Sequence, residues 1–111
     1  MQIDEESRGG VLILRPTGRI DSATARAFEN RLIAAVEPGP AVVVVDCGGL
    51  TLLTSAGLRS LLKAARRAKP ARSRILLAAI PAPVRPVFEI SGFSSLFETH
   101  ASADAALAAL G

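Results

Sequence analysis

The sequence has few of the residues on which metal sites, disulfides and most enzyme active sites depend. Its 111 residues include one cysteine and one histidine, and no tryptophan or tyrosine. One cysteine excludes an internal disulfide and any multi-cysteine zinc site, and one histidine supplies no metal-ligand cluster. We therefore expect no metal and no cofactor, and the low cysteine content favours a reducing, cytoplasmic setting.

Long apolar runs and a targeting segment are also missing. The longest aliphatic runs, six residues each at 75–80 and 105–110, are far shorter than the roughly 20 residues that span a bilayer. The first six residues carry three acids, where a signal peptide would carry basic residues. The sequence thus predicts no membrane insertion. Its length and its 50% hydrophobic content predict one folded domain over residues 1–111.

Charge is distributed unevenly along the chain. The net charge is +3, yet residues 59–74 hold seven cations and no acid, and the other 95 residues hold six cations and ten acids, a balance of −4. The seven cations are Arg59, Lys63, Arg66, Arg67, Lys69, Arg72 and Arg74. Some of them would complement a helix C-terminus or lie in solvent, and the alternative is a contact surface for an acidic partner or a phosphate-rich ligand. No aromatic platform or helix-turn-helix pattern accompanies them, so we expect no nucleic-acid partner.

Strand patterns recur along the chain, separated by turn signals. Residues 2–7 and 11–14 are expected to form a hairpin, which Pro16-Thr17-Gly18 would end. Uninterrupted apolar runs at 42–45 and 75–80 are typical of strands covered on both faces of a parallel sheet. A further short strand is expected within 93–100, and residues 50–53 are expected to form a loop.

Helix patterns alternate with these strands. Apolar residues at three- and four-residue steps predict helices over 22–36 and from 54 to about 69. A short helix is expected after Pro81 with its end at Gly92, and a last one over 103–110 after a capping Ser102. The order β-β-α-β-α-β-α-β-α predicts an α/β domain with a mixed sheet of about five strands and about four helices.

Catalytic chemistry has few candidates in this chain. Cys47 and His100 could be counted as a nucleophile and its base, but Cys47 ends a buried strand and is interpreted as a core residue, and His100 as a loop residue. The pairs Gly9-Gly10 and Gly48-Gly49 lack the lysine and spacing of a phosphate loop. The sequence therefore does not predict an enzyme.

Four polar residues stand where α/β proteins often place functional groups. Asp21 and Asp46 follow predicted strands, and their structural alternatives are a helix cap for Asp21 and a strand-end acid for Asp46. Thr54 and Ser55 begin a predicted helix, where a hydroxyl residue usually serves as a cap. Local chemistry alone leaves both interpretations open.

Taken together with their neighbours, these residues resemble the STAS domain family, named for sulfate transporters and anti-sigma factor antagonists. An apolar strand ends in Asp46, a short loop follows, and Thr54-Ser55-Ala56-Gly57-Leu58 opens a helix. Upstream, residues 17–25 resemble the family's Gly-x-hydrophobic-Asp segment, and residues 80–92 resemble its third helix. The resemblance covers nearly the whole chain.

The resemblance implies a compact α/β domain and, for a free-standing member of this size, a bacterial anti-sigma factor antagonist (anti-anti-sigma factor). Such a protein regulates transcription by partner switching. It binds an ATP-binding, kinase-type anti-sigma factor until that kinase phosphorylates a serine at the start of the second helix, and a phosphatase is a further implied partner. By position Ser55 corresponds to that serine. Thr54, where many members carry Asp, is a second candidate acceptor.

The partner-binding surface implied by the resemblance consists of Asp21, Ser22, Thr54, Ser55, Ala56, Gly57 and Arg59. The chain is expected to be a monomer or a weak dimer. One alternative is a STAS subunit of a bacterial lipid or solute ABC transporter, which would bind an ATPase subunit without a phosphorylation cycle. The other is a nucleotide-binding sensory module.

Overall fold

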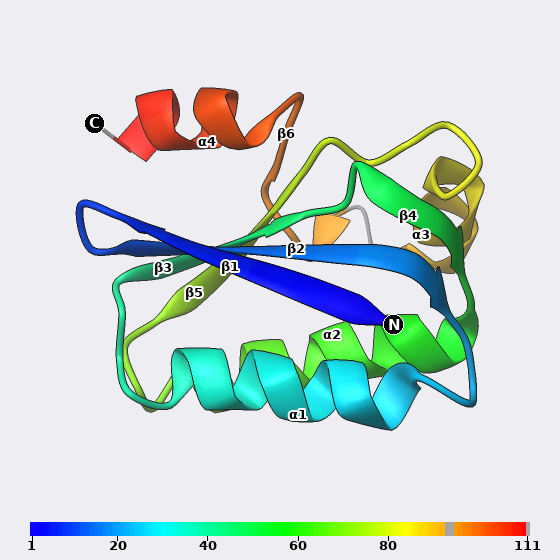
Figure 1. The fold of residues 1–111 in the computed structure, drawn as a ribbon, viewed down its shortest axis with the longest axis horizontal. Coiled ribbons are helices and arrows are strands. Elements are labelled where there is room, and N and C mark those ends of the chain that lie inside the picture. Colours follow the sequence, from blue (N-terminus) through cyan, green and yellow to red (C-terminus); the bar gives the residue numbers. More distant parts are fainter. Residues whose placement is uncertain (93–94, 111) are drawn as a thin grey trace.

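One mixed sheet with helices on both faces forms the frame of the protein (Figure 1). The computed structural model describes residues 1–92 and 95–110. In these residues the elements are β1 (Gln2–Arg8), β2 (Val11–Ile20), α1 (Ala25–Val36), β3 (Val42–Asp46), β4 (Gly49–Leu53), α2 (Ser55–Ala68), β5 (Arg74–Ala78), α3 (Arg85–Ser91), β6 (Thr99–His100) and α4 (Ala103–Leu110). The predicted α/β class, mixed sheet and four helices are confirmed.

The long strand β2 organises the sheet. The strand order is β1-β2-β3-β5-β6; β1 and β2 pair antiparallel as a hairpin, and the other pairs are parallel. Residues 11–14 of β2 pair with β3, and residues 17–20 pair with β4, so two strands share one edge of β2 in succession. The connections through α1 and α2 place these two helices side by side on one face, while α4 covers part of the other (Figure 1).

Strand β3 is buried from both sides, as its run of valines predicts. Val43 and Val45 belong to the larger core cluster, which contains Phe28 of α1 and Leu61 of α2. Val44 belongs to the smaller cluster on the α4 side. Because each face of a central parallel strand meets a helix layer, the strand has no polar face and its sequence does not alternate.

The predicted end of the second strand at Pro16-Thr17-Gly18 is wrong, since β2 continues to Ile20. Pro16 lies between the segment of β2 that pairs with β3 and the segment that pairs with β4. A missing N–H at this point interrupts neither parallel ladder. Gly18 has a φ of +93°, and the register with β4 shifts between Gly18 and Arg19, so the glycine allows a bulge rather than a stop.

The loop predicted for residues 50–53 is also wrong, because it is β4, the sixth strand. Leu50 and Leu53 are buried, and β4 pairs with β2. This long-range pairing has no signal in the local sequence pattern.

The first helix begins at Ala25 rather than residue 22, because a turn closed by the carbonyl of Asp21 occupies the intervening residues. Likewise α3 begins at Arg85, after a turn closed from Val84 N–H to Pro81 O.

The remaining boundaries agree closely with prediction. Strand β5 spans Arg74–Ala78, and Gly92 ends α3 in the left-handed conformation with φ +76°. The strand expected within 93–100 is β6, and residues 93–94 lie outside the described part of the chain. None of the helices in the described ranges is both long and apolar enough to cross a membrane.

Candidate functional site

The candidate site lies where two neighbouring parallel strands end. Ile20, the last residue of β2, is the register partner of Leu53, the last residue of β4. Asp21 and Thr54 follow them directly and begin the connections into α1 and α2. The backbone N–H of Thr54 donates to the carbonyl of Ile20 at 3.0 Å, which joins the two connections. The fold thus brings the two sequence motifs to one carboxyl edge of the sheet.

Asp21 organises the turn before α1. Its Oδ1 accepts a hydrogen bond from the N–H of Ala23 at 3.0 Å, and its carbonyl accepts from Thr24 and Ala25 at 3.1 and 2.8 Å. Thr24 supports the same turn, since its hydroxyl donates to Arg19 O at 2.9 Å and accepts from the N–H of Asp21 at 3.0 Å. Asp21 therefore closes a turn rather than capping the helix itself, and Ser22 lies exposed within that turn.

Thr54 and Ser55 differ in exposure and in bonding. Thr54 has an extended backbone, and its hydroxyl donates to the carbonyl of Ile20 at 3.3 Å instead of capping α2. Thr54 is half-buried, whereas Ser55, the first residue of α2, is exposed. The first N–H groups of a helix have no acceptor within it and carry the positive end of the helix dipole. A negative group on the Ser55 hydroxyl would therefore meet a favourable local field.

Gly57 is buried beneath this surface. A Cβ at this position would lie 2.4 Å from Cδ1 of Leu53 and 2.7 Å from Cγ2 of Ile20. The first turn of α2 therefore packs directly on the last residues of β2 and β4, which positions the exposed residues around it. Of the seven predicted partner-binding residues, Gly57 can contribute only through this packing.

A shallow depression of about 220 Å³ lies between the N-terminal parts of α1 and α2. Its lining residues are Ser22, Ala25, Arg26, Glu29, Ala56, Arg59, Ser60 and Lys63. The buried Ser60 hydroxyl donates to Ala25 O at 2.9 Å and so ties the two helices together at its floor. Three of the predicted site residues, Ser22, Ala56 and Arg59, line it together. Sequence reasoning missed Arg26, because the pairing of α1 with α2 is a tertiary contact without a local signal.

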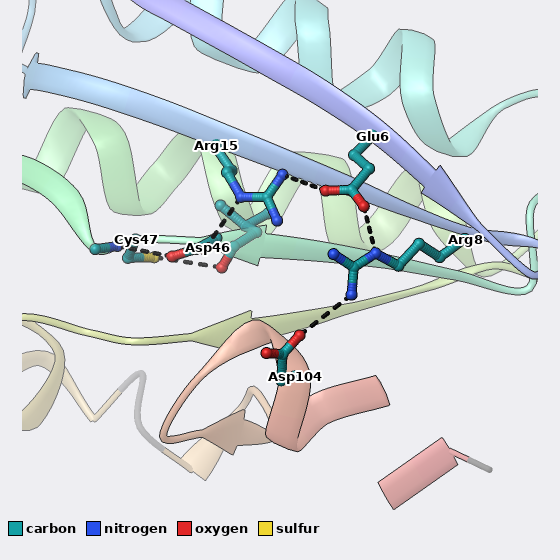
Figure 2. A network of polar contacts seen from close by, with 8 residues as sticks. Glu6, Arg8, Arg15, Asp46, Cys47 and Asp104 are labelled. Carbon is teal, nitrogen blue, oxygen red and sulfur yellow. Dashed lines mark hydrogen bonds and ion pairs between the residues drawn. The ribbon is translucent and has the colours of Figure 1, made fainter. Parts of the chain in front are cut away.

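Asp46 belongs to a separate polar network that links four elements (Figure 2). Its Oδ2 lies 3.4 Å from Nε of Arg15 and its Oδ1 accepts from Gly48 N–H at 3.0 Å. Arg15 in turn reaches Glu6 at 2.8 Å, Glu6 pairs with Arg8, and Arg8 lies 3.2 Å from Asp104 of α4. Hydrogen bonds from Arg8, which has the larger effect, and from Arg15 lower the pKa of Glu6. These contacts agree with Asp46 as a strand-end structural acid.

The structure gives Cys47, the candidate nucleophile, and His100, its candidate base, different environments. Cys47 is 1% exposed, and its thiol lies 3.6 Å from Val45 O. Burial, with a smaller contribution from the Asp46 charge, raises the pKa of Cys47 to about 12. The prediction of His100 as a loop residue is wrong, because His100 is the last residue of β6 and pairs with Ala78; its Nε2 contacts Glu98 at 2.7 Å. Among the described residues no group of three or more His, Cys, Asp and Glu is placed to hold a metal ion.

A larger depression of about 740 Å³ lies between α3 and the ends of β5 and β6. It is lined partly by apolar side chains, with Arg85, Glu89 and His100 among its polar residues. It contains none of the predicted site residues, and of the prolines around α3 Pro81 lines it.

Comparison with known proteins gives a consistent result. The STAS domain profile matches residues 2–106. A Bordetella bronchiseptica protein named "Putative anti-sigma factor antagonist BtrV" is 38% identical over 109 residues, which cover 98% of this chain and 94% of that protein. The crystal structure of an anti-sigma factor antagonist from Mycobacterium paratuberculosis superposes with a TM-score of 0.88 and 26% identity, over 97% of this chain and 92% of that one.

The fold is also that of the anti-sigma factor antagonist SpoIIAA. Its unphosphorylated form superposes with a TM-score of 0.82 and 19% identity, over 98% of this chain and 96% of that one. The phosphorylated form of the Bacillus protein superposes with a TM-score of 0.74 and 18% identity, over 99% of this chain and all of that one.

Proposed function

The chain belongs to the STAS domain family, and from this premise we propose that it is an anti-sigma factor antagonist switched by phosphorylation of Ser55. The names of the Bordetella and mycobacterial relatives support the antagonist role. SpoIIAA, which shares the fold, is known in unphosphorylated and phosphorylated forms, and this supports a phosphorylation cycle. The protein binds an ATP-binding, kinase-type anti-sigma factor and is that kinase's substrate, not itself an enzyme. The encounter takes place in the cytoplasm, where ATP is available.

The observation that carries the proposal is the exposed Ser55 at the first position of α2, beside the turn of Asp21. A kinase needs a hydroxyl that can enter its active site. The Thr54 hydroxyl is half-buried and already donates to Ile20 O, whereas Ser55 is exposed. Ser55 is therefore the favoured acceptor of the two. The kinase transfers the γ-phosphoryl group of ATP to Ser55 Oγ, ADP leaves, and a phosphatase later removes the phosphate by hydrolysis.

Phosphorylation releases the partner without unfolding the domain. A phosphate adds about −1.5 to −2 charges. At a helix N-terminus that charge meets free N–H groups and the positive dipole end, which stabilises it locally. The loss of binding must therefore arise at the interface, where a buried dianion is poorly solvated or meets like charge. A penalty of about 3 kcal/mol there weakens binding more than a hundredfold.

A pull-down from the source organism with wild-type and Ser55→Glu baits tests the proposal. We expect wild type to retain an ATP-binding kinase-type protein and Ser55→Glu to lose it. The expected melting temperature of Ser55→Glu lies within a few degrees of wild type, since the added charge sits at a helix N-terminus. Ser55→Ala should bind constitutively. Thr54→Val is the control: it removes the neighbouring hydroxyl and keeps the shape of the threonine side chain.

Two results would overturn the proposal. One is retention of ABC-transporter subunits by wild type and Ser55→Glu alike, which would make Ser55 a structural contact. The other is unfolding of Ser55→Glu, which would explain loss of binding without any switch at the interface.

A further inference from the structure

Four exposed cations form a continuous band beside the candidate site, which we call the basic strip: Arg26, Arg59, Lys63 and Arg66. The last three follow one another at four- and three-residue steps on α2, so they share a helix face. Arg26 of α1 lines the same depression as Arg59 and Lys63. The strip therefore runs along the seam between the two helices.

Most of the charge in the basic strip is not neutralised within the molecule. Lys63 lies 3.7 Å from Glu29, but across the described residues Arg26, Arg59 and Arg66 make no ion pair within 4.0 Å. Two cations just outside the strip have partners, whereas Lys69 and Arg72 make no ion pair within 4.0 Å among the described residues. Arg67 pairs with Glu37 at 2.9 Å and Arg74 with Glu98 at 3.3 Å. Among Arg26 and the cations of residues 59–74, unpaired positive charge in the described residues therefore lies on the seam, at Arg26, Arg59 and Arg66, and beyond the end of α2, at Lys69 and Arg72, and only the seam group adjoins the candidate site.

The basic strip is continuous with the proposed phosphorylation site. Ala56 and Ser22 line the depression together with Arg26 and Arg59. Arg59 follows Ser55 by four residues, a spacing that places both on one side of α2 about one turn apart. A protein bound over Ser55 would extend naturally onto the strip, and a phosphate on Ser55 would place its negative charge next to Arg59.

We propose that the basic strip is the docking surface for an acidic, carboxylate-bearing patch of the partner protein, and that phosphate on Ser55 weakens binding partly by neutralising this strip. The inference rests on the proposed function and names the chemistry of its partner. Outside residues 59–74 the chain has a balance of −4. That background repels an extended polyanion such as nucleic acid but leaves a local acidic patch free to dock.

The association rate of the purified partner tests this inference. We would measure it by stopped-flow fluorescence against sodium chloride for wild type, Arg26→Ala/Arg59→Ala and Lys69→Ala/Arg72→Ala. Each double variant removes two positive charges, but only the first removes them from the basic strip. We expect the first to associate about tenfold more slowly at low salt and to lose most of its salt dependence, because steering falls with the local charge. The control should stay close to wild type.

The outcomes separate this inference from the proposed function. If Ser55→Glu releases the partner but Arg26→Ala/Arg59→Ala behaves like its control, the inference is overturned and the switch stands. If Ser55→Glu keeps the partner, the switch fails, and the same comparison of association rates on that partner still decides the inference. If wild type binds no protein, or retains nucleic acid through the basic strip, the inference is overturned. Matching melting temperatures of the two double variants exclude misfolding as the cause.

Discussion

At position 57 the protein has room for a hydrogen atom and for nothing larger. In Gly57→Ala the new methyl group would press on Leu53 and Ile20, both buried strand ends. Overpacking of this kind lowers stability by about 1–3 kcal/mol, and the higher helix propensity of alanine relative to glycine offsets up to about 1 kcal/mol of this loss. We expect a net loss of stability in urea unfolding. Ser55→Ala, an exposed change two residues earlier, is the control and should be nearly neutral.

The buried thiol of Cys47 should make stability depend on alkaline pH. In the unfolded chain it ionises near its ordinary pKa of 9.0, whereas the folded chain holds the proton until about pH 12. As pH rises through this window the unfolded state loses its proton first, so the free energy of unfolding falls by up to about 1.4 kcal/mol per pH unit. Cys47→Ala should lack this component when both proteins are unfolded in urea at neutral pH and above pH 9. If the free energy of unfolding changed equally with pH in wild type and in Cys47→Ala, the prediction would be contradicted.

Single residues were predictable where their role is local. The left-handed Gly92 and the exposed Ser55 at a helix start follow from turn and helix-start patterns in the sequence. The place of Arg26 in the depression was not predictable, because it depends on α2 packing beside α1. Nor could the packing role of Gly57 be predicted, since it depends on Ile20, which is distant in sequence, and on how Leu53 packs at the end of β4.

Among the elements, α4 depends on its capping residue. The hydroxyl of Ser102 accepts a hydrogen bond from the N–H of Ala105 at 3.0 Å. Ala103 and Ala106 are buried against the second core cluster, so loosening the helix also exposes that cluster. Ser102→Ala should cost about 1 kcal/mol of stability, and Ser102→Asp, which keeps an acceptor, should cost less. Equal losses in the two variants would show that the cap is not what stabilises α4.

The element that could not be predicted from the sequence is one whose structure depends on pairing with another strand, rather than on its own hydrophobic pattern. The valine run of β3 identifies a buried strand on its own, and it was predicted. The residues of β4 have neither a β-branched run nor clean alternation, and they form a strand because β2 extends past β3 and offers a free edge there. The carboxyl edge of the site therefore depends on a strand whose existence is a tertiary effect.

Across the whole molecule, the polar network of Glu6, Arg8, Arg15, Asp46 and Asp104 joins the hairpin to β3 and α4 (Figure 2). The lowered pKa of Glu6 means that its contribution is complete above 4.5 and is lost as pH falls through the folded value. Glu6→Gln should therefore remove part of the acid sensitivity of wild type in chemical unfolding. The charged groups of the network are exposed or half-buried, so the difference should be small and should shrink at high salt.

At the same scale, the proposed phosphorylation site and the basic strip are neighbours on α2. The depression and three cations of the basic strip, Arg26, Arg59 and Lys63, lie along the seam of α1 and α2, and Ser55 begins α2 about one turn before Arg59. The network of Figure 2 involves none of these residues. Changes at the exposed residues of the site should therefore alter binding with little effect on stability, and changes in the network should do the opposite.

The most direct test of the account is the location of the phosphate. The purified chain would be incubated with ATP and the ATP-binding partner recovered by the wild-type bait, and the modified residue would be identified by tandem mass spectrometry. The account predicts one phosphate, on Ser55, with Thr54→Val modified as wild type and Ser55→Ala unmodified. Phosphate on Thr54, or no phosphate with a partner that stays bound in the presence of ATP, would contradict it.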